Sequence, residues 1–168
     1  MAGEMRGNGE TDALPAASDG PQLFVNLQYI KDLSFENPRA PQSLVQQSAQ
    51  PEVSINVDVK AHNLNQEAYE VVLTINVTAQ LQKEPVFLVE LAYAAVVTIR
   101  NAPEPLLANL ILVETPRIIF PFARAVIANA TRDGGFPPLM INPIDFADLL
   151  RRQQSPEQPE PGDEDISS

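Results

Sequence analysis

The sequence predicts an α+β fold, a four-stranded antiparallel sheet with two to three helices packed on one face. Two observations lead to this prediction. Apolar and polar residues alternate through 69–81 and again through 87–99, which is the period of a half-buried strand. Beyond residue 100 the apolar spacing changes to that of an amphipathic helix. The strands are therefore expected first, and the helices after them.

The two alternating runs predict an antiparallel hairpin joined by the polar link 82–85. Two more strands are expected before it. One spans residues 22–36, whose odd positions are apolar except for Lys31, and this predicts a single apolar face through Leu27, Tyr29 and Phe35. The other spans residues 52–60. The prolines between 37 and 51 cannot donate to a sheet ladder, so this segment is expected to be a surface connection.

The helical part is less regular in sequence. The run 106–113 is compatible with a short helix or with an irregular crossover. Pro121 suits the first turn of the main helix, and Gly134 suits its end. Asn142 followed by a proline predicts the start of a last helix, with Phe146 on its apolar face.

The acidic and proline-rich ends divide the chain into three parts. Residues 1–21 are expected to be a disordered lead, 22–154 the folded domain, and 155–168 a disordered acidic tail. The two ends carry −3 and −5 of the net charge of −11. The middle is only mildly acidic and has no basic patch, which argues against nucleic acid or anionic lipid as partners.

Several classes of protein are disfavoured by composition. There is no cysteine, and no apolar run is long enough for a signal sequence or a membrane span. A cytoplasmic protein without membrane insertion is therefore expected. His62 is the only histidine, and no nucleophile motif, phosphate loop or metal-ligand spacing accompanies it. We expect no enzyme activity, no cofactor and no metal.

Acidic residues follow the polar side of two predicted strands. Asp32 and Glu36 share a parity and are expected to lie roughly 13 Å apart on one face, and Glu90 has the polar parity of its own strand. These acids are either an ordinary solvated face or a docking surface for a basic partner. Apolar residues in excess of what one covered face needs indicate oligomerisation or a binding groove, with core packing as the alternative.

Six short motifs, in this order, resemble the SecB family of bacterial protein-export chaperones. They are residues 29–36 (YIKDLSFE), 50–53 (QPEV), 69–73 (YEVVL), 87–90 (FLVE), 119–124 (IFPFAR) and 135–138 (GFPP). The resemblance runs from about residue 22 to residue 150. It implies a homotetramer, a dimer of dimers, that holds unfolded precursor proteins in apolar grooves and delivers them to the SecA translocation ATPase.

The resemblance also implies site residues. Asp32, Glu36, Leu88 and Glu90 match the exposed sheet face on which the family docks the zinc-binding C-terminal tail of SecA. The client groove is carried over more loosely, to Leu44, Val45, Leu106, Leu107, Leu110, Leu112, Phe120 and Phe122. Ala49 stands where many members carry a tryptophan. The competing hypothesis is an acidic adaptor that recruits partners through its disordered ends, with the sheet as a scaffold.

Overall fold

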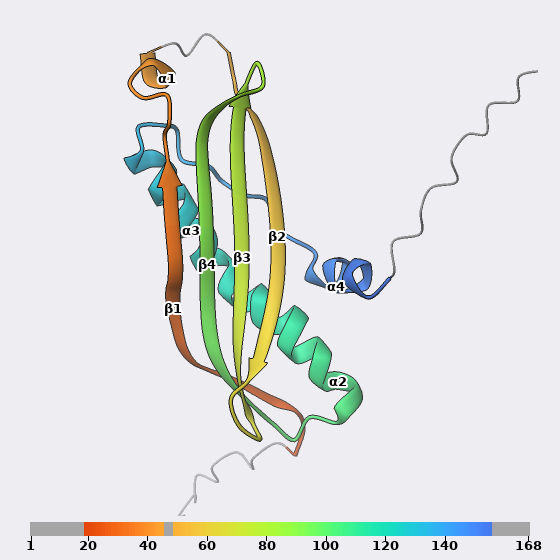
Figure 1. The fold of residues 1–168 in the computed structure, drawn as a ribbon. Helices are drawn as coiled ribbons and strands as arrows, with labels where there is room; N and C mark the ends of the chain where they lie inside the picture. Colours follow the sequence, from red (N-terminus) through yellow and green to blue (C-terminus); the bar gives the residue numbers. More distant parts are fainter. Residues whose placement is uncertain (1–18, 46–48, 156–168) are drawn as a thin grey trace, which may run out of the picture.

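The computed structural model describes residues 19–45 and 49–155, which form one sheet with helices on one side (Figure 1). Four strands pair antiparallel in the order β1-β4-β3-β2, and every helix except a short one between β1 and β2 follows the last strand. The predicted α+β class and four-stranded sheet are confirmed. Apart from residues 19–21 and Ser155, the ends predicted to be disordered lie outside the described residues.

The predicted hairpin is the centre of the sheet. It consists of β3 (Ala68–Leu81) and β4 (Glu84–Arg100). The turn between them has positive φ at both Gln82 (54°) and Lys83 (66°), which is the type I′ geometry that matches strand twist. Neither residue is one of the glycines or asparagines that favour this geometry. The long ladder on either side therefore holds the turn in place.

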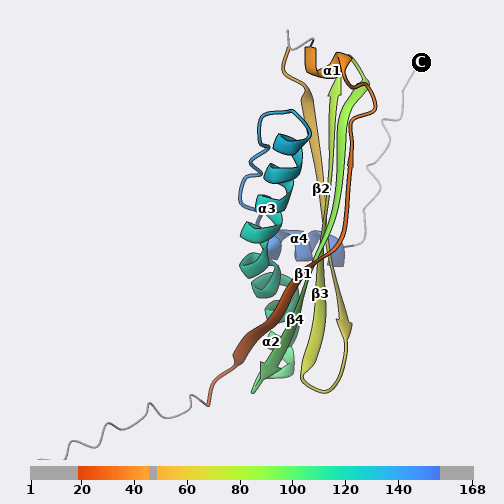
Figure 2. The ribbon, with the colours of Figure 1, turned by 90° about the vertical axis from the view of Figure 1, so that its left-hand side faces the viewer.

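The two faces of the sheet have different environments. Odd-numbered residues of the hairpin, such as Leu73 and Leu91, belong to the apolar core beneath the helices, and we call this side the covered face. Even-numbered residues, such as Asn76 and Glu90, lie on the opposite side, the open face. Figure 2 shows the sheet edge-on, with the helices α2 (Glu104–Asn109) and α3 (Thr115–Asp133) on one side of it.

Strand β1 (Gln22–Glu36) forms one edge of the sheet and pairs with β4. Its register shifts twice, because Asn26 and Lys31 are extra residues with no partner on β4. Each such bulge reverses the alternation of side chains. The predicted single apolar face of this strand is therefore wrong in its middle, where Leu27 and Tyr29 lie on the open face.

The other edge of the sheet is β2 (Glu52–Asn63), which pairs with β3 without a register shift. The prolines between β1 and β2 keep their connection out of the ladder, as predicted. The described part of this connection contains one short helix, α1 (Gln42–Val45).

The segment after β4 is helical throughout, which decides between the two alternatives for residues 106–113. It comprises α2 (Glu104–Asn109), the π-helical turn η1 (Leu110–Glu114) and α3 (Thr115–Asp133). The Thr115 hydroxyl donates a hydrogen bond of 2.8 Å to the Leu110 carbonyl across the π-helical turn.

Pro121 does not begin the main helix, as the sequence analysis predicted, but lies inside α3. A proline in a helix interior removes one hydrogen bond, to the carbonyl four residues earlier. Here that residue is Arg117, and both Arg117 and Pro121 are exposed, so water can satisfy the freed carbonyl.

The core lies between α3 and the covered face. Helix α3 runs obliquely behind the sheet in Figure 1 and presents Ile119, Ala123 and Ile127 to the strands, each of them fully buried. On the strands, the fully buried partners are Val71, Leu73, Ile75, Val77, Val89, Leu91 and Val97. Helix α3 thus packs on the covered face, where Ile111, Val113, Ile141 and Phe146 of the neighbouring segments join the same core.

The last helix, α4 (Phe146–Gln154), begins four residues later than the Asn142 signature predicted. Asp145 is its N-cap, and its carboxylate accepts the Asp148 N–H at 3.0 Å. The helix reaches the free edge of β2, where Gln153 donates to Asp58 at 2.8 Å. Within residues 19–45 and 49–155, no helix has both the length and the apolar character needed to cross a bilayer.

Candidate functional site

A groove of about 1070 Å³ opens at the end of the sheet where β1 ends and β2 begins. Four segments of the chain form it: α1 with Arg39 shortly before it, the start of β2 with the three residues before it, the turn region of the hairpin, and the segment after α3. The lining residues are Arg39, Gln42, Ser43, Val45, Ala49, Gln50, Pro51, Val53, Leu81, Gln82, Val86, Phe87, Phe136, Pro137, Pro138, Leu139 and Met140.

Three aromatic rings pack together at the inner side of the groove. The ring centroids of Phe87 and Phe136 are 4.9 Å apart, and that of Phe35 lies 6.0 Å from Phe87 and 6.4 Å from Phe136. Gly134 makes room for them, because a Cβ atom built on it would lie 2.2 Å from the Phe35 ring. The end of β1, the start of β4 and the end of α3 are thereby held together.

The outer wall, residues 136–140, begins at the C-terminus of α3. The N–H groups of Gly135 and Phe136 bond to the carbonyls of Arg132 (3.0 Å) and Thr131 (3.1 Å), and Gly135 has a φ of 93°. These are the two bonds of a Schellman motif, with glycine at its left-handed position. Gly134 caps the helix, as predicted, and Gly135 makes the turn that starts the wall.

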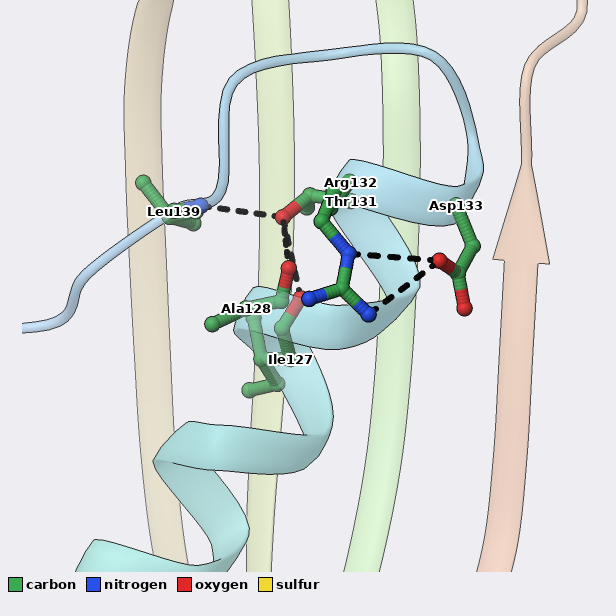
Figure 3. Close-up of polar contacts among 6 residues, drawn as sticks. All are labelled: Ile127, Ala128, Thr131, Arg132, Asp133 and Leu139. Carbon is green, nitrogen blue, oxygen red and sulfur yellow. Dashed lines mark hydrogen bonds and ion pairs between the residues drawn. The ribbon is translucent and has the colours of Figure 1, made fainter.

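Thr131 fastens the far end of this wall to the helix (Figure 3). Its buried hydroxyl lies 3.0 Å from the carbonyls of both Ile127 and Ala128, and it accepts the Leu139 N–H at 2.9 Å. A helix carbonyl is thus linked through one side chain to the backbone of the wall. One side of the groove is therefore held in place by hydrogen bonds within the chain itself.

The rim of the groove is apolar and accessible. Val45, Met140 and Val53 are 80%, 62% and 38% exposed. Exposed apolar side chains around a concave apolar surface are typical of a site that buries apolar groups of a partner. The neighbouring edge of β2 also has no strand beside it in the described sheet, so an extended chain could pair with its backbone.

The predicted groove residues lie in three places. Val45 lines the groove, and Leu44 touches the position of a Cβ built on Gly135. Leu106, Leu107, Leu110 and Leu112 lie on α2 and η1 and do not line it. Phe120 is 5% exposed and packs edge-on against Phe146, whereas Phe122 is 52% exposed on α3. The structure does not bring these three sets together.

The predicted docking residues do come together on the open face. In the register of β1 and β4, Glu36 is paired with Leu88, Ser34 with Glu90, and Asp32 with Ala92. The three carboxylates therefore lie on two adjacent strands and one face. Their side chains make no hydrogen bond or ion pair with any residue that the structure describes.

A fourth acid on the open face, Glu70 of β3, is paired. Lys31 donates to its two carboxylate oxygens at 2.8 and 2.9 Å, and the Tyr29 hydroxyl also donates to it. The Lys31 and Tyr29 hydrogen bonds hold the pKa of Glu70 below its usual value, and the bond to Glu70 raises the pKa of Tyr29 to about 12. Asp32, Glu36 and Glu90 thus have no partner among the described residues, whereas the charge of Glu70 is compensated.

Sequence reasoning missed two parts of these sites. The wall 136–140 was noticed only as a motif, and its position against Phe87 depends on contacts between distant segments. The cluster of Tyr29, Lys31 and Glu70 was missed because the bulges of β1 give no clear signal in the alternation. No group of three or more metal-binding side chains occurs among the described residues.

One family of known proteins matches most of this chain. The family model "Preprotein translocase subunit SecB" matches residues 16–157. Among curated relatives, "Protein-export protein SecB" of Rhodopseudomonas palustris is 52% identical over 146 residues, covering 87% of this chain and 90% of the relative. The protein of the same name from Paramagnetospirillum magneticum is 51% identical over 142 residues, covering 84% of this chain and 91% of the relative.

A solved structure gives the same fold. It is the SecB-like chaperone of Mycobacterium tuberculosis in complex with a ChAD peptide from an antitoxin, with a TM-score of 0.56 and 17% identity over 73% of this chain and 90% of that one. This likeness supports the architecture alone. The family model and the curated relatives, matched over most of the chain, show that it belongs to the SecB family of protein-export chaperones.

Proposed function

We propose that this chaperone holds unfolded precursor proteins in the groove beside Phe87 and Phe136 and delivers them to the SecA ATPase through the acids of the open face. It does so by binding alone, in the cytoplasm, as a dimer of dimers. The observation that carries the proposal is the separation of the two surfaces, an apolar groove at one end and unpaired carboxylates on the open face.

The groove suits a client that is recognised by its chemistry and not by its sequence. Burial of apolar side chains contributes roughly 25 cal/mol per Å² whatever their order in the chain. Val45, Val53 and Met140 offer such contacts, and the free edge of β2 offers backbone hydrogen bonds that any extended peptide can make.

The open face suits a basic partner. Asp32, Glu36 and Glu90 are exposed and have no partner among residues 19–45 and 49–155, with Leu88 among them as an apolar contact. Charges at the rim of an interface mainly set the rate and specificity of association. The zinc-binding tail of SecA is the partner that the family resemblance indicates for these residues.

Assembly is supported by apolar surface that one subunit leaves uncovered. Ile30 and Leu33 on β1 are 48% and 41% exposed, and Ile118 and Phe122 on α3 are 43% and 52% exposed. Strand β1 also has a free edge. A second copy of the chain could cover the edge of β1. A second dimer could then cover the exposed side chains of α3. Binding one client over several grooves would raise its apparent affinity through effective concentration.

Native mass measurement with and without a permanently unfolded polypeptide tests holding and assembly together. We expect a tetramer that takes up one client chain. A stable monomer that binds the client equally tightly would contradict the proposal.

Charge reversal tests the docking surface. The variant D32K/E36K/E90K should lose binding of the zinc-loaded SecA tail peptide by about 100-fold or more, since three rim charges change sign. Client binding should be unchanged. The matched control E52K/E84K/E104K changes the net charge equally at exposed positions away from Asp32, Glu36 and Glu90, which we call the docking row. It should bind the peptide within a few fold of the unchanged protein.

A further inference from the structure

The second bulge of β1 places a cation beside the first acid of the docking row. Ile30 is paired with Tyr93 on the covered face, and Asp32 with Ala92 on the open face. Lys31, the unpaired residue between them, also reaches the open face, where it meets Glu70. Without a bulge, neighbouring residues would point to opposite faces. With it, Lys31 and Asp32 share one.

The hydrogen bonds of Glu70 hold the ammonium group of Lys31 in place. Both of its carboxylate oxygens accept from Lys31, and Tyr29 donates a third hydrogen bond. The side chains of Tyr29 and Lys31 come from β1 and reach over β4 to Glu70 on β3. The small residue Ala94, which is paired with Tyr29 on β4, leaves room for them. The Glu70 side chain is 13% exposed and that of Lys31 is 46% exposed, so the acceptor is the sheltered member of the pair.

We propose that Glu70 is a positioning residue of the docking surface: it compensates the charge of Lys31 and holds its ammonium group away from Asp32. This inference rests on the proposed docking function. Lys31 is the neighbour of Asp32 in sequence and lies on the same face, so Asp32 is the nearest carboxylate of the row for an ammonium group that Glu70 has released. Asp32 would then be partly neutralised, and a basic partner would meet a cation at the start of the row.

A role in stability alone would give a different pattern of mutant effects. If the cluster only tied β1 to β3, removing Glu70 and removing Lys31 would weaken the sheet in the same way. If its role is charge compensation, the two substitutions should have opposite effects on docking. Removing Glu70 exposes a positive charge, whereas removing Lys31 releases a negative one.

The experiment measures binding of the zinc-loaded SecA tail peptide to the full-length protein at two ionic strengths. Glu70→Gln should weaken binding about tenfold at low salt, and less at high salt, because one freed charge near the row acts through a screened field. Lys31→Met should tighten binding about two- to threefold. The double variant E70Q/K31M should return to within about twofold of the unchanged protein, because the charge that Glu70 compensates is gone.

One further variant keeps the outcomes distinct. Asp32→Asn should weaken binding; if it does not, the proposed docking function itself is wrong. If Asp32→Asn weakens binding but Glu70→Gln does not, docking stands and the positioning role is wrong. If the double variant binds as weakly as Glu70→Gln, the effect is structural and the proposal is overturned. Should Glu70→Gln fail to fold, a weaker-binding Lys31→Met would overturn the proposal by itself.

Discussion

The covered and open faces of the sheet are made from the same four strands, yet they are stabilised in different ways. On the covered face, Leu73, Ile75 and Leu91 are sealed under α3. On the open face, Tyr29, Lys31 and Glu70 form a polar cluster across three strands, and the nearby acids are unpaired. The first face supplies the stability of the fold, which leaves the second free to carry charge for a partner.

Two leucines of β4 give the largest expected contrast between the faces. Leu91 is 1% exposed on the covered face, and Leu88 is partly exposed on the open face. Leu91→Ala should lower the free energy of unfolding by about 2–5 kcal/mol, through lost burial and a new cavity. Leu88→Ala should lower it by less than about 1 kcal/mol. Urea denaturation measures both, and equal losses would contradict the division between the faces.

Thr131 tests how the covered side holds the groove wall. Thr131→Val keeps the shape of the side chain but leaves the Leu139 N–H without its acceptor, at a cost of about 1–3 kcal/mol. Hydrogen exchange at Leu139 should become much faster, and client affinity should fall. Thr131→Ser retains the hydroxyl and is the control. Unchanged exchange at Leu139 in the valine variant would show that the wall is held by other contacts.

The rim of the groove tests client holding without loss of stability. Val45→Glu with Met140→Glu should weaken binding of an unfolded polypeptide by about tenfold, since each change removes accessible apolar area that a client would bury. Leu64→Glu is the matched control, because Leu64 is 53% exposed in the turn between β2 and β3 and does not line the groove. If Leu64→Glu weakened binding of the unfolded polypeptide equally, the client would bind exposed apolar residues in general and not the groove.

The polar cluster of the open face predicts a pH window of stability. The folded-state pKa of Glu70 is held below 4.5, so its contribution is present above pH 4.5 and is lost as the pH falls through the lowered pKa. The pKa of Tyr29 is raised from 10.0 to about 12, so its contribution is present below pH 10.0 and is lost as the pH rises toward 12.

Glu70→Gln should therefore flatten the pH dependence of the free energy of unfolding at both ends. Glu90→Gln is the control, because the Glu90 carboxylate makes no ion pair or hydrogen bond within the described residues. Parallel curves for the unchanged protein and Glu70→Gln would contradict a paired Glu70.

The smallest effect is expected from the ends of the chain. Deleting residues 1–21 and 155–168 should leave client affinity unchanged within about twofold, because the groove is lined by residues 39–140. Loss of client holding in this variant would favour the acidic adaptor hypothesis over the chaperone groove.

The sequence predicted the parts of the fold in which local pattern and pairing agree. The hairpin of β3 and β4 alternates over most of its length, with one register shift beside the turn, so its strands and most of their covered residues could be read directly. In β1, the extra residues Asn26 and Lys31 each invert the alternation, and no property of either side chain marks a bulge. The assignment of faces failed there for that reason. The prediction that Pro121 begins the main helix was also wrong. The helix continues through this proline, because water can replace the hydrogen bond that the Arg117 carbonyl lacks.

The candidate sites were predictable to different degrees for a physical reason. The docking row lies on neighbouring strands of the sheet, so parity and family motifs were enough to bring Asp32, Glu36 and Glu90 together. The groove depends on Phe35, Phe87 and Phe136 meeting across about 100 residues of chain, and such contacts have no local signal. Of the residues predicted for a client groove, Val45 lines this one.

The central claim, that the two surfaces act separately, is tested most directly by titrating the SecA tail peptide against the free protein and against protein saturated with unfolded client. Binding free energies at two sites are coupled reciprocally, so either ligand can report on the other. The account predicts the same Kd for the peptide in both titrations and a ternary complex. Displacement of client by the peptide, with the Kd rising in proportion to client concentration, would mean a shared site and would contradict it.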